Sequence, residues 1–277
     1  MDVRWNLPEE FETADGRVRW ASSGHGDPVV LLHGSPFSSY IWRDIAPALA
    51  RTRRVHVFDL LGYGQSEMRA DQDVSLTAQA KLFVRLLAHW RLARPSVIAH
   101  DIGGAVALRA LLLEGAAYRD LTLVDAVGGG AWGTGFFKLI RDNAAVFERL
   151  PDYAHEALVA SHLRHATHVG HAPGVLDAYL APWRGPRGQA AFYRQYRSIG
   201  QAETDEVEPL LGQVDVPTRI VWGRQDRLLP PEFAELLHAR IPGAELHWVE
   251  GAGHTLQDDA PAALLGHLTA DFAAGCR

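Results

Sequence analysis

The sequence predicts an α/β fold in which a mostly parallel, twisted sheet is flanked by helices and carries an inserted helical cap. Three observations predict it. Short apolar segments rich in β-branched residues alternate with longer segments of helical pattern along most of the chain. The alternation stops over residues 127–211, where helical patterns continue without a strand pattern. Turns of small and polar residues follow several apolar segments, where α/β sheets bind their ligands.

The predicted strands are short and rich in valine, isoleucine and leucine. Such runs are typical of parallel strands that are covered on both faces. Residues 17–22 are expected to form an antiparallel strand at the edge of the sheet. The predicted parallel strands are residues 28–32, 54–58, 96–99, 121–124, 218–222 and 245–249.

Helical patterns separate these strands. They cover residues 39–49, 76–90, 104–113, 232–240 and 260–272. Residues 127–211 are too many for a plain loop in a compact domain. We therefore expect a core domain of residues 1–126 and 212–277, and a cap domain of residues 127–211 over the carboxyl ends of the strands.

Composition excludes several classes of protein. The net charge is −6 and no run of lysine and arginine occurs, so we expect neither a nucleic acid nor an anionic membrane as partner. No stretch of 18 apolar residues occurs, and the first ten residues lack the apolar region of a secretory signal. The single cysteine, Cys276, cannot form an internal disulfide, which fits a reducing compartment and a cytoplasmic location. The sequence does not indicate an oligomeric state.

An aspartate stands in the turn after the strand at 96–99. Residues 99–103 have the layout G-x-S-x-G, with Ala99 in the first place and Asp101 in the middle. A strand that reverses into a helix this quickly strains the central residue and presents its side chain at the helix N-terminus, which favours an anion. A carboxyl group there is ionised at neutral pH without a base to activate it. Asp101 is therefore either a nucleophile or an ordinary helix N-cap.

Three further loops at predicted strand ends carry polar residues. His33, Gly34 and Ser35 follow the strand at 28–32, and Asp226 follows the strand at 218–222. His254 lies in a glycine-rich loop after the strand at 245–249. The chain order Asp101, Asp226, His254 matches the order nucleophile, acid, base.

On these motifs the sequence resembles the α/β-hydrolase superfamily, and within it the branch of haloalkane dehalogenases and epoxide hydrolases. Residues 33–43 and 59–66 are also similar, and the resemblance covers nearly the whole chain outside the cap. It implies that Asp101 is the nucleophile, Asp226 the acid and His254 the base. It also implies an oxyanion hole formed by the backbone N–H groups of Ser35 and Ile102, and a reaction without a metal or cofactor.

Some members of this superfamily take the acid from another strand end, which makes Asp125, after the strand at 121–124, the alternative acid.

The sequence departs from the dehalogenases at two positions. They hold the halide with an asparagine in the place of Ser35 and a tryptophan in the place of Ile102. Fluoroacetate-type enzymes bind the substrate carboxylate with arginines in the places of Ile102 and Ala105. Because this chain lacks all of these side chains, the resemblance favours an epoxide over a halide substrate, although epoxide hydrolases also usually have tryptophan in the place of Ile102.

Epoxide hydrolases donate a proton to the ring oxygen from tyrosines of the cap. Tyr196 lies in a similar Tyr-Arg-Ser-Ile stretch and is the first candidate for this role. Tyr153 is a second candidate by its place in the cap, and Tyr193 is an alternative to Tyr196.

The predicted reaction has two steps. A carboxylate attacks a saturated carbon without prior deprotonation, and His254 then activates a water that hydrolyses the resulting ester on Asp101. The runner-up is hydrolysis of a carbon–halogen bond; lyase or isomerase chemistry and a non-catalytic ligand receptor are further alternatives. We expect a small apolar organic substrate in a pocket that includes His33, Trp132, Phe136 and Trp183.

Three cap histidines, His162, His165 and His168, are interpreted as one solvated helix face rather than a metal site.

Overall fold

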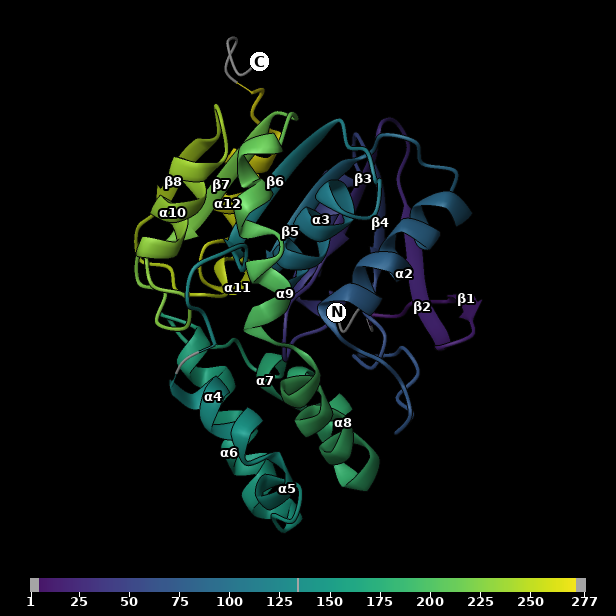
Figure 1. Cartoon of the computed structure of the whole chain (residues 1–277), viewed down its shortest axis with the longest axis vertical. Helices are drawn as coiled ribbons and strands as arrows, with labels where there is room; N and C mark the ends of the chain where they lie inside the picture. The colour runs from purple at the N-terminus through teal and green to yellow at the C-terminus, as the bar shows by residue number, and fades with distance from the viewer. Residues whose placement is uncertain (1–4, 134, 273–277) are drawn as a thin grey trace.

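The computed structural model describes residues 5–133 and 135–272, so Cys276 lies outside the described residues. The described chain forms one eight-stranded sheet of order β1-β2-β4-β3-β5-β6-β7-β8 (Figure 1). The strands are β1 (Glu9–Thr13), β2 (Gly16–Ser23), β3 (Pro28–Leu32), β4 (Arg54–Phe58), β5 (Ser96–Asp101), β6 (Asp120–Ala126), β7 (Thr218–Gly223) and β8 (Glu245–Val249).

The sheet is parallel from β4 to β8 and antiparallel at β1 and β2. All six predicted parallel strands are present. The predicted strand at 17–22 is antiparallel as expected, but β2 is not the edge, because β1 pairs with its outer side. The sequence of β1, Glu-Glu-Phe-Glu-Thr, has one apolar residue and therefore carries little strand signal.

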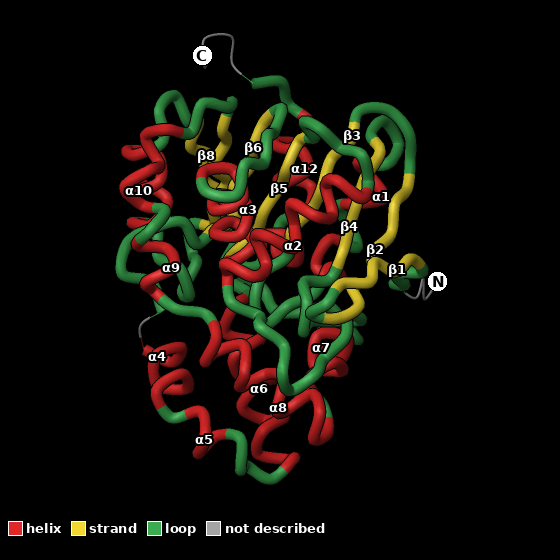
Figure 2. The backbone as a smooth tube through the Cα atoms, turned by 45° about the vertical axis from the view of Figure 1, so that its right-hand side comes forward, coloured by secondary structure: helices red, strands yellow, loops and turns green. Residues whose placement is uncertain are grey.

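Helices cover both faces of the sheet. Helices α2, α3 and α10 pack on one face, and α1 and α12 lie together on the other (Figures 1 and 2). The core helices are α1 (Ala46–Leu49), α2 (Leu76–His89), α3 (Ile102–Leu112), α10 (Glu232–Arg240), α11 (Leu256–Asp259) and α12 (Pro261–Thr269), with a 3₁₀ turn η1 (Ser39–Trp42).

Two predicted helices are shorter than expected. The pattern at 39–49 splits into η1 and α1, and α1 starts with a proline in its first turn. The pattern at 260–272 yields α12, which ends at Thr269.

The helices after β6 form a group at the carboxyl ends of the parallel strands (Figure 1). They are α4 (Gly135–Asp142), α5 (Ala144–Phe147), α6 (Asp152–Ala166), α7 (Val175–Leu180), η2 (Ala181–Trp183) and α8 (Gly185–Ser198). The chain returns through α9 (Gln201–Asp205) and η3 (Glu208–Gln213), and η3 packs against α3 and α10. A cap–core division at residues 126/127 and 211/212 stays a prediction.

Within residues 5–133 and 135–272, no helix combines the length and the apolar character needed to cross a bilayer.

Gly223, the last residue of β7, sits where two loops meet. A Cβ atom there would overlap the carbonyl oxygen of Gly253 and lie 2.6 Å from that of Ala252. We expect Gly223→Ala to lower the free energy of unfolding by about 2 kcal/mol because backbone atoms must move to admit the methyl group. Gly212→Ala is the matched control, since nothing lies within 4 Å of its Cβ position. Urea denaturation measures both, and equal stability of the two variants would contradict this packing.

Candidate active site

Asp101 ends β5 and directly precedes α3. Its backbone has φ 51° and ψ −127°, a strained conformation for a non-glycine residue, and the register between β5 and β6 shifts at this point. This is the strand–turn–helix geometry that the motif at 99–103 predicts. A Cβ atom on Gly34 would overlap the side chain of Asp101, so the neighbouring loop approaches this closely only with a glycine.

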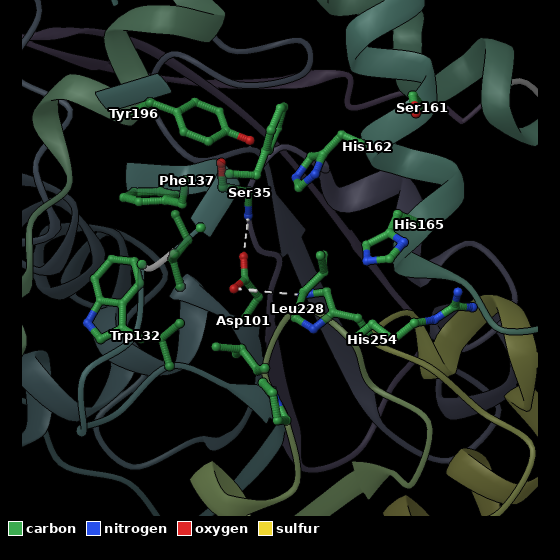
Figure 3. Close-up of a pocket in the computed structure, with 18 of the residues that line it drawn as sticks. Ser35, Asp101, Trp132, Phe137, Ser161, His162, His165, Tyr196, Leu228 and His254 are labelled. Atoms are coloured by element: carbon green, nitrogen blue, oxygen red, sulfur yellow. Dashed lines mark hydrogen bonds and ion pairs between the residues drawn. The ribbon is translucent and has the colours of Figure 1, made fainter. Parts of the chain in front are cut away.

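The two oxygens of the Asp101 carboxylate have different surroundings. Oδ2 accepts a hydrogen bond of 2.7 Å from the backbone N–H of Ser35 (Figure 3). Oδ1 lies 3.8 Å from Nε2 of His254. Burial raises the pKa of Asp101 above its usual value, whereas the charge of His254 and the backbone N–H groups of Ile102 and Ser35 limit that rise. The carboxylate is therefore held by the amide of Ser35, and the amide of Ile102 also favours its charged form.

His254 is oriented by Asp226. Its Nδ1 lies 2.8 Å from Oδ2 of Asp226, and both side chains are buried. The other oxygen of Asp226 accepts hydrogen bonds from the backbone N–H groups of Leu228 (2.7 Å) and Leu229 (2.9 Å). Because Nδ1 of His254 donates to Asp226, Nε2 is the free nitrogen and faces Asp101.

The charges around His254 make it more basic. Burial alone lowers the pKa of His254, but the charge of Asp226, its hydrogen bond and the charge of Asp101 outweigh burial and raise the pKa above 6.5. The imidazole therefore acts as a base above that raised pKa and loses this capacity as the pH falls through it.

Asp125 lies at the end of β6 with φ 40°. Its Oδ1 accepts a hydrogen bond of 2.8 Å from the backbone N–H of Gly223, and its side chain is fully buried. Burial raises the pKa of Asp125 well above its usual value, and the charge of Asp226 raises it further. Both effects favour the protonated form of Asp125, while the hydrogen bond to His254 is made by Asp226.

Asp101 and His254 lie at the bottom of a pocket of about 920 Å³ between the sheet and the helices above it. Aromatic and aliphatic side chains form one side of this pocket, and polar side chains of α6 lie on another (Figure 3). The apolar lining residues include Trp132, Phe136, Phe137, Leu158, Leu228 and Leu229. The polar ones are Ser35, Ser161, His162, Arg164, His165, Tyr196 and Arg227, besides Asp101 and His254.

Within residues 5–133 and 135–272, no three histidine, cysteine, aspartate or glutamate side chains are grouped so that they could hold a metal ion.

The alpha/beta hydrolase fold model matches residues 27–261. The chain belongs to the α/β-hydrolase fold family. A solved structure of an alpha/beta hydrolase fold protein from Burkholderia ambifaria is 46% identical, has a TM-score of 0.93 and covers 96% of this chain and 98% of its own. A protein of Pseudomonas aeruginosa, described as a proposed epoxide hydrolase, is 25% identical with a TM-score of 0.82, and 96% of each chain is covered.

Curated relatives of this α/β-hydrolase-fold chain extend the similarity. An uncharacterized protein of Mycobacterium tuberculosis is 29% identical over 271 residues, with 91% of this chain and 77% of the relative covered. Haloalkane dehalogenase 2 of Mycobacterium bovis is 24% identical over 278 residues, with 94% and 91% covered.

The structure separates the candidate tyrosines of this α/β-hydrolase-fold chain. Tyr196, on α8, is buried and lines the pocket, with its hydroxyl group directed toward the space above Asp101 (Figure 3). The prediction for Tyr153 is wrong, because its side chain is 79% exposed. Tyr193 is no substitute for Tyr196, because its hydroxyl group is 2.9 Å from Nδ1 of His155 inside the cap.

Of the four predicted pocket residues, Trp183 and His33 do not line the pocket. Trp132 and Phe136 line the pocket as expected. Trp183 is buried in the cap and donates its indole N–H to the carbonyl of Pro36 at 2.8 Å. His33 lies beneath the loop of Ser35, where Nε2 accepts from the backbone N–H of Leu60 at 2.9 Å. Both side chains support the site from outside the pocket lining.

The cap histidines are not one solvated face. Helix α6 ends at Ala166, so His168 lies beyond it, whereas His162 and His165 line the pocket. Burial lowers the pKa of His162 to about 3, so its imidazole is neutral at physiological pH. The sequence of this helix does not indicate which of its sides faces the pocket. For that reason His162 was not predicted to line it.

Titration of His254 distinguishes the two candidate acids. In Asp226→Asn we expect the pKa of His254 to fall below its value in the wild type, because burial then outweighs the remaining charge of Asp101. Asp125→Asn, the matched control, is expected to leave that pKa raised. Histidine ring signals followed by NMR across the pH range measure both. A fall in Asp125→Asn together with no change in Asp226→Asn would assign the acid to Asp125.

Proposed function

We propose that the protein is a hydrolase that opens an epoxide by forming a covalent ester on Asp101. One observation carries the proposal: the carboxylate of Asp101 and the hydroxyl group of Tyr196 line the same pocket, with His254 beside the carboxylate. An epoxide needs a nucleophile on its carbon and a proton donor near its oxygen. This pocket supplies both, and a relative proposed to be an epoxide hydrolase supports the same chemistry.

In the first step, Oδ1 of Asp101 attacks a ring carbon and the bond from that carbon to the ring oxygen breaks. The ring oxygen takes the proton of the Tyr196 hydroxyl group, which leaves a neutral ester on Asp101 and a tyrosinate. Burial raises the pKa of Tyr196 well above its usual value, and the nearby Tyr63 and Asp101 raise it further. Tyr196 therefore keeps its proton until the strongly basic alkoxide develops.

His162 is the neighbour of Tyr196 in the pocket. The two rings lie 6.5 Å apart between centroids at an angle of 66°. Because His162 is neutral, its N–H group can donate to the opening ring oxygen alongside Tyr196 without placing a buried charge there. We assign it as a second polar contact to that oxygen.

In the second step, His254 takes a proton from water, and the water oxygen attacks the carbonyl carbon of the ester. The backbone N–H groups of Ser35 and Ile102 already hold the carboxylate, and they stabilise the negative charge of the tetrahedral intermediate. The intermediate collapses to the diol and the Asp101 carboxylate, which now contains one solvent oxygen. Protonated His254 returns its proton to the tyrosinate through solvent, so the enzyme is restored.

Carbon–halogen hydrolysis is the second candidate because a curated relative is a haloalkane dehalogenase. A departing halide needs N–H donors in a dry pocket. Trp132 lines the pocket, but its indole N–H donates to Oγ1 of Thr204 at 2.6 Å, and that of Trp183 donates to Pro36. Both indole donors are engaged within the protein, which favours the epoxide.

Replacing His254 by glutamine tests the covalent step. We expect His254→Gln to accumulate the ester on Asp101 after addition of styrene oxide, because the base of the second step is gone and the nucleophile is intact. Intact mass spectrometry and peptide mapping detect the adduct. In the wild type, one turnover in H₂¹⁸O places ¹⁸O in Asp101. Turnover without an adduct or label on Asp101 would favour lyase or isomerase chemistry, and binding without turnover would favour a receptor.

Replacing Tyr196 by phenylalanine tests the proton donor. We expect Tyr196→Phe to slow ester formation by about 100-fold, because the leaving oxygen loses a positioned acid. Tyr153→Phe is the matched control and should react at the wild-type rate, since Tyr153 is exposed. Rapid-quench measurement of the adduct in the His254→Gln background isolates this step. Halide release from haloalkanes faster than epoxide opening would instead favour the dehalogenase.

A further inference from the structure

The charges that line the pocket are unbalanced. Among its lining residues Asp101 is the only carboxylate, whereas Arg164 and Arg227 are both cations. Both arginines are solvent-exposed, and within the described residues neither forms an ion pair with a carboxylate. Other arginines, such as Arg184 before α8 and Arg224 after β7, are paired with nearby acids.

The two arginines converge from different parts of the fold. Arg164 belongs to the last turn of α6, and Arg227 follows Asp226 in the loop after β7. The Nη2 of Arg227 donates to the backbone carbonyl of Thr167, just past the end of α6, at 3.2 Å. This hydrogen bond joins Arg227 to the end of the helix that carries Arg164 and His165, and all three residues line the pocket (His165 is labelled in Figure 3).

The two acids of α11, Asp258 and Asp259, are engaged elsewhere. The carboxylate of Asp259 accepts hydrogen bonds from the hydroxyl group of Thr167 and from the backbone N–H groups of His168 and Gly253. Asp258 pairs with Arg43 at 2.6 Å. Neither carboxylate forms an ion pair with Arg164 or Arg227, so the positive charge of the two arginines is available to a ligand.

The opposite side of the pocket is apolar. Phe137 packs between Trp132 and Tyr196, with ring centroids 5.2 and 4.9 Å away, and Phe136 packs on His162. A ligand that fills this pocket therefore meets aromatic rings on one side and guanidinium groups on the other. That combination fits an amphiphilic molecule better than a wholly apolar one.

We propose that the preferred substrate is an epoxide with an apolar body and a carboxylate at the end away from the ring, bound by Arg164 and Arg227. This inference rests on the proposed function. A guanidinium group pairs with a carboxylate through two parallel hydrogen bonds, which would orient the substrate and place the ring over Asp101. The same positive charge also offsets the repulsion between an anionic substrate and the Asp101 carboxylate.

Three aryl epoxides that differ only at the far end of the molecule test this inference: a carboxylate, its primary amide and a trimethylammonium. We expect kcat/KM to be about tenfold higher for the carboxylate than for the amide, and lowest for the ammonium. The advantage should shrink when NaCl rises from about 20 to about 300 mM, because exposed charges are screened.

The double variant Arg164→Gln/Arg227→Gln should remove the advantage of the carboxylate, so that kcat/KM becomes about equal for the carboxylate and the amide. Arg187→Gln is the matched control, because Arg187 is an exposed cap arginine outside the pocket lining and should leave the preference intact. Equal kcat/KM for carboxylate and amide in the wild type, with the ester still formed on Asp101, overturns this inference and leaves the proposed function standing.

A binding measurement keeps the two hypotheses separate when no epoxide reacts. Calorimetry compares an unreactive aryl carboxylate with its amide on the wild type, the double variant and Arg187→Gln. If the carboxylate binds more tightly than the amide, and only the double variant loses this difference, the result supports an anionic ligand even without turnover. The absence of turnover would then count only against epoxide hydrolysis. Equal affinities for the two ligands reject the anionic ligand.

Discussion

The hydrogen bond from the Ser35 backbone N–H to Oδ2 of Asp101 is the interaction on which the site depends. It fixes the carboxylate of a residue whose backbone is strained, and it makes the two oxygens inequivalent. In the proposed reaction Oδ2 occupies the position where negative charge develops during ester hydrolysis, which leaves Oδ1, near His254, as the attacking oxygen. Gly34 must lack a side chain for this hydrogen bond to form, because a Cβ atom would overlap Asp101. In the proposed mechanism, the Ser35 amide that would stabilise the oxyanion of the second step thus already holds the attacking carboxylate of the first.

The protonation of the buried acids determines how basic His254 is. Asp101 and Asp226 lie against the imidazole of His254, and burial together with the charge of Asp226 raises the pKa of Asp125 and favours its protonated form. Two carboxylates then face His254 and raise its pKa. Formation of an ester on Asp101 would remove one of those charges, and the pKa of His254 would fall in the intermediate. A larger fraction of His254 would thus be neutral in the step where it must accept a proton from water. The protonation state of the base would in this way follow the progress of the reaction.

The sheet and the triad could be predicted from the sequence, whereas the walls of the pocket could not. Asp101, Asp226 and His254 follow predicted strands, and parallel strands bring their carboxyl ends to one edge whatever else the chain does. Cap residues lack such a rule. Tyr153 and Tyr196 are both cap tyrosines, yet one is exposed and the other lines the pocket, because helix packing decides which side of each helix is covered. The acidic strand β1 was missed for a local reason, since its pairing with β2 outweighs its weak strand pattern.

Residues between β6 and β7 supply most of the pocket lining beyond Asp101 and His254, so the proposed substrate would be selected largely by this segment. Trp132 places an apolar ring in the pocket while its N–H is bonded to Thr204, so it contributes surface rather than a hydrogen bond to a leaving group. The hydroxyl group of Tyr196 is directed toward the space above Asp101, which would suit an oxygen leaving group better than a halide. Arg164 lies on α6 two residues after His162, and both side chains line the pocket. The helix therefore fixes the position of the guanidinium group relative to the proposed contact of His162 with the ring oxygen. If Arg164 binds the substrate as proposed, a rigid helix that carries both groups would convert remote binding energy into alignment at Asp101, and that alignment would depend on how firmly α6 packs on the core.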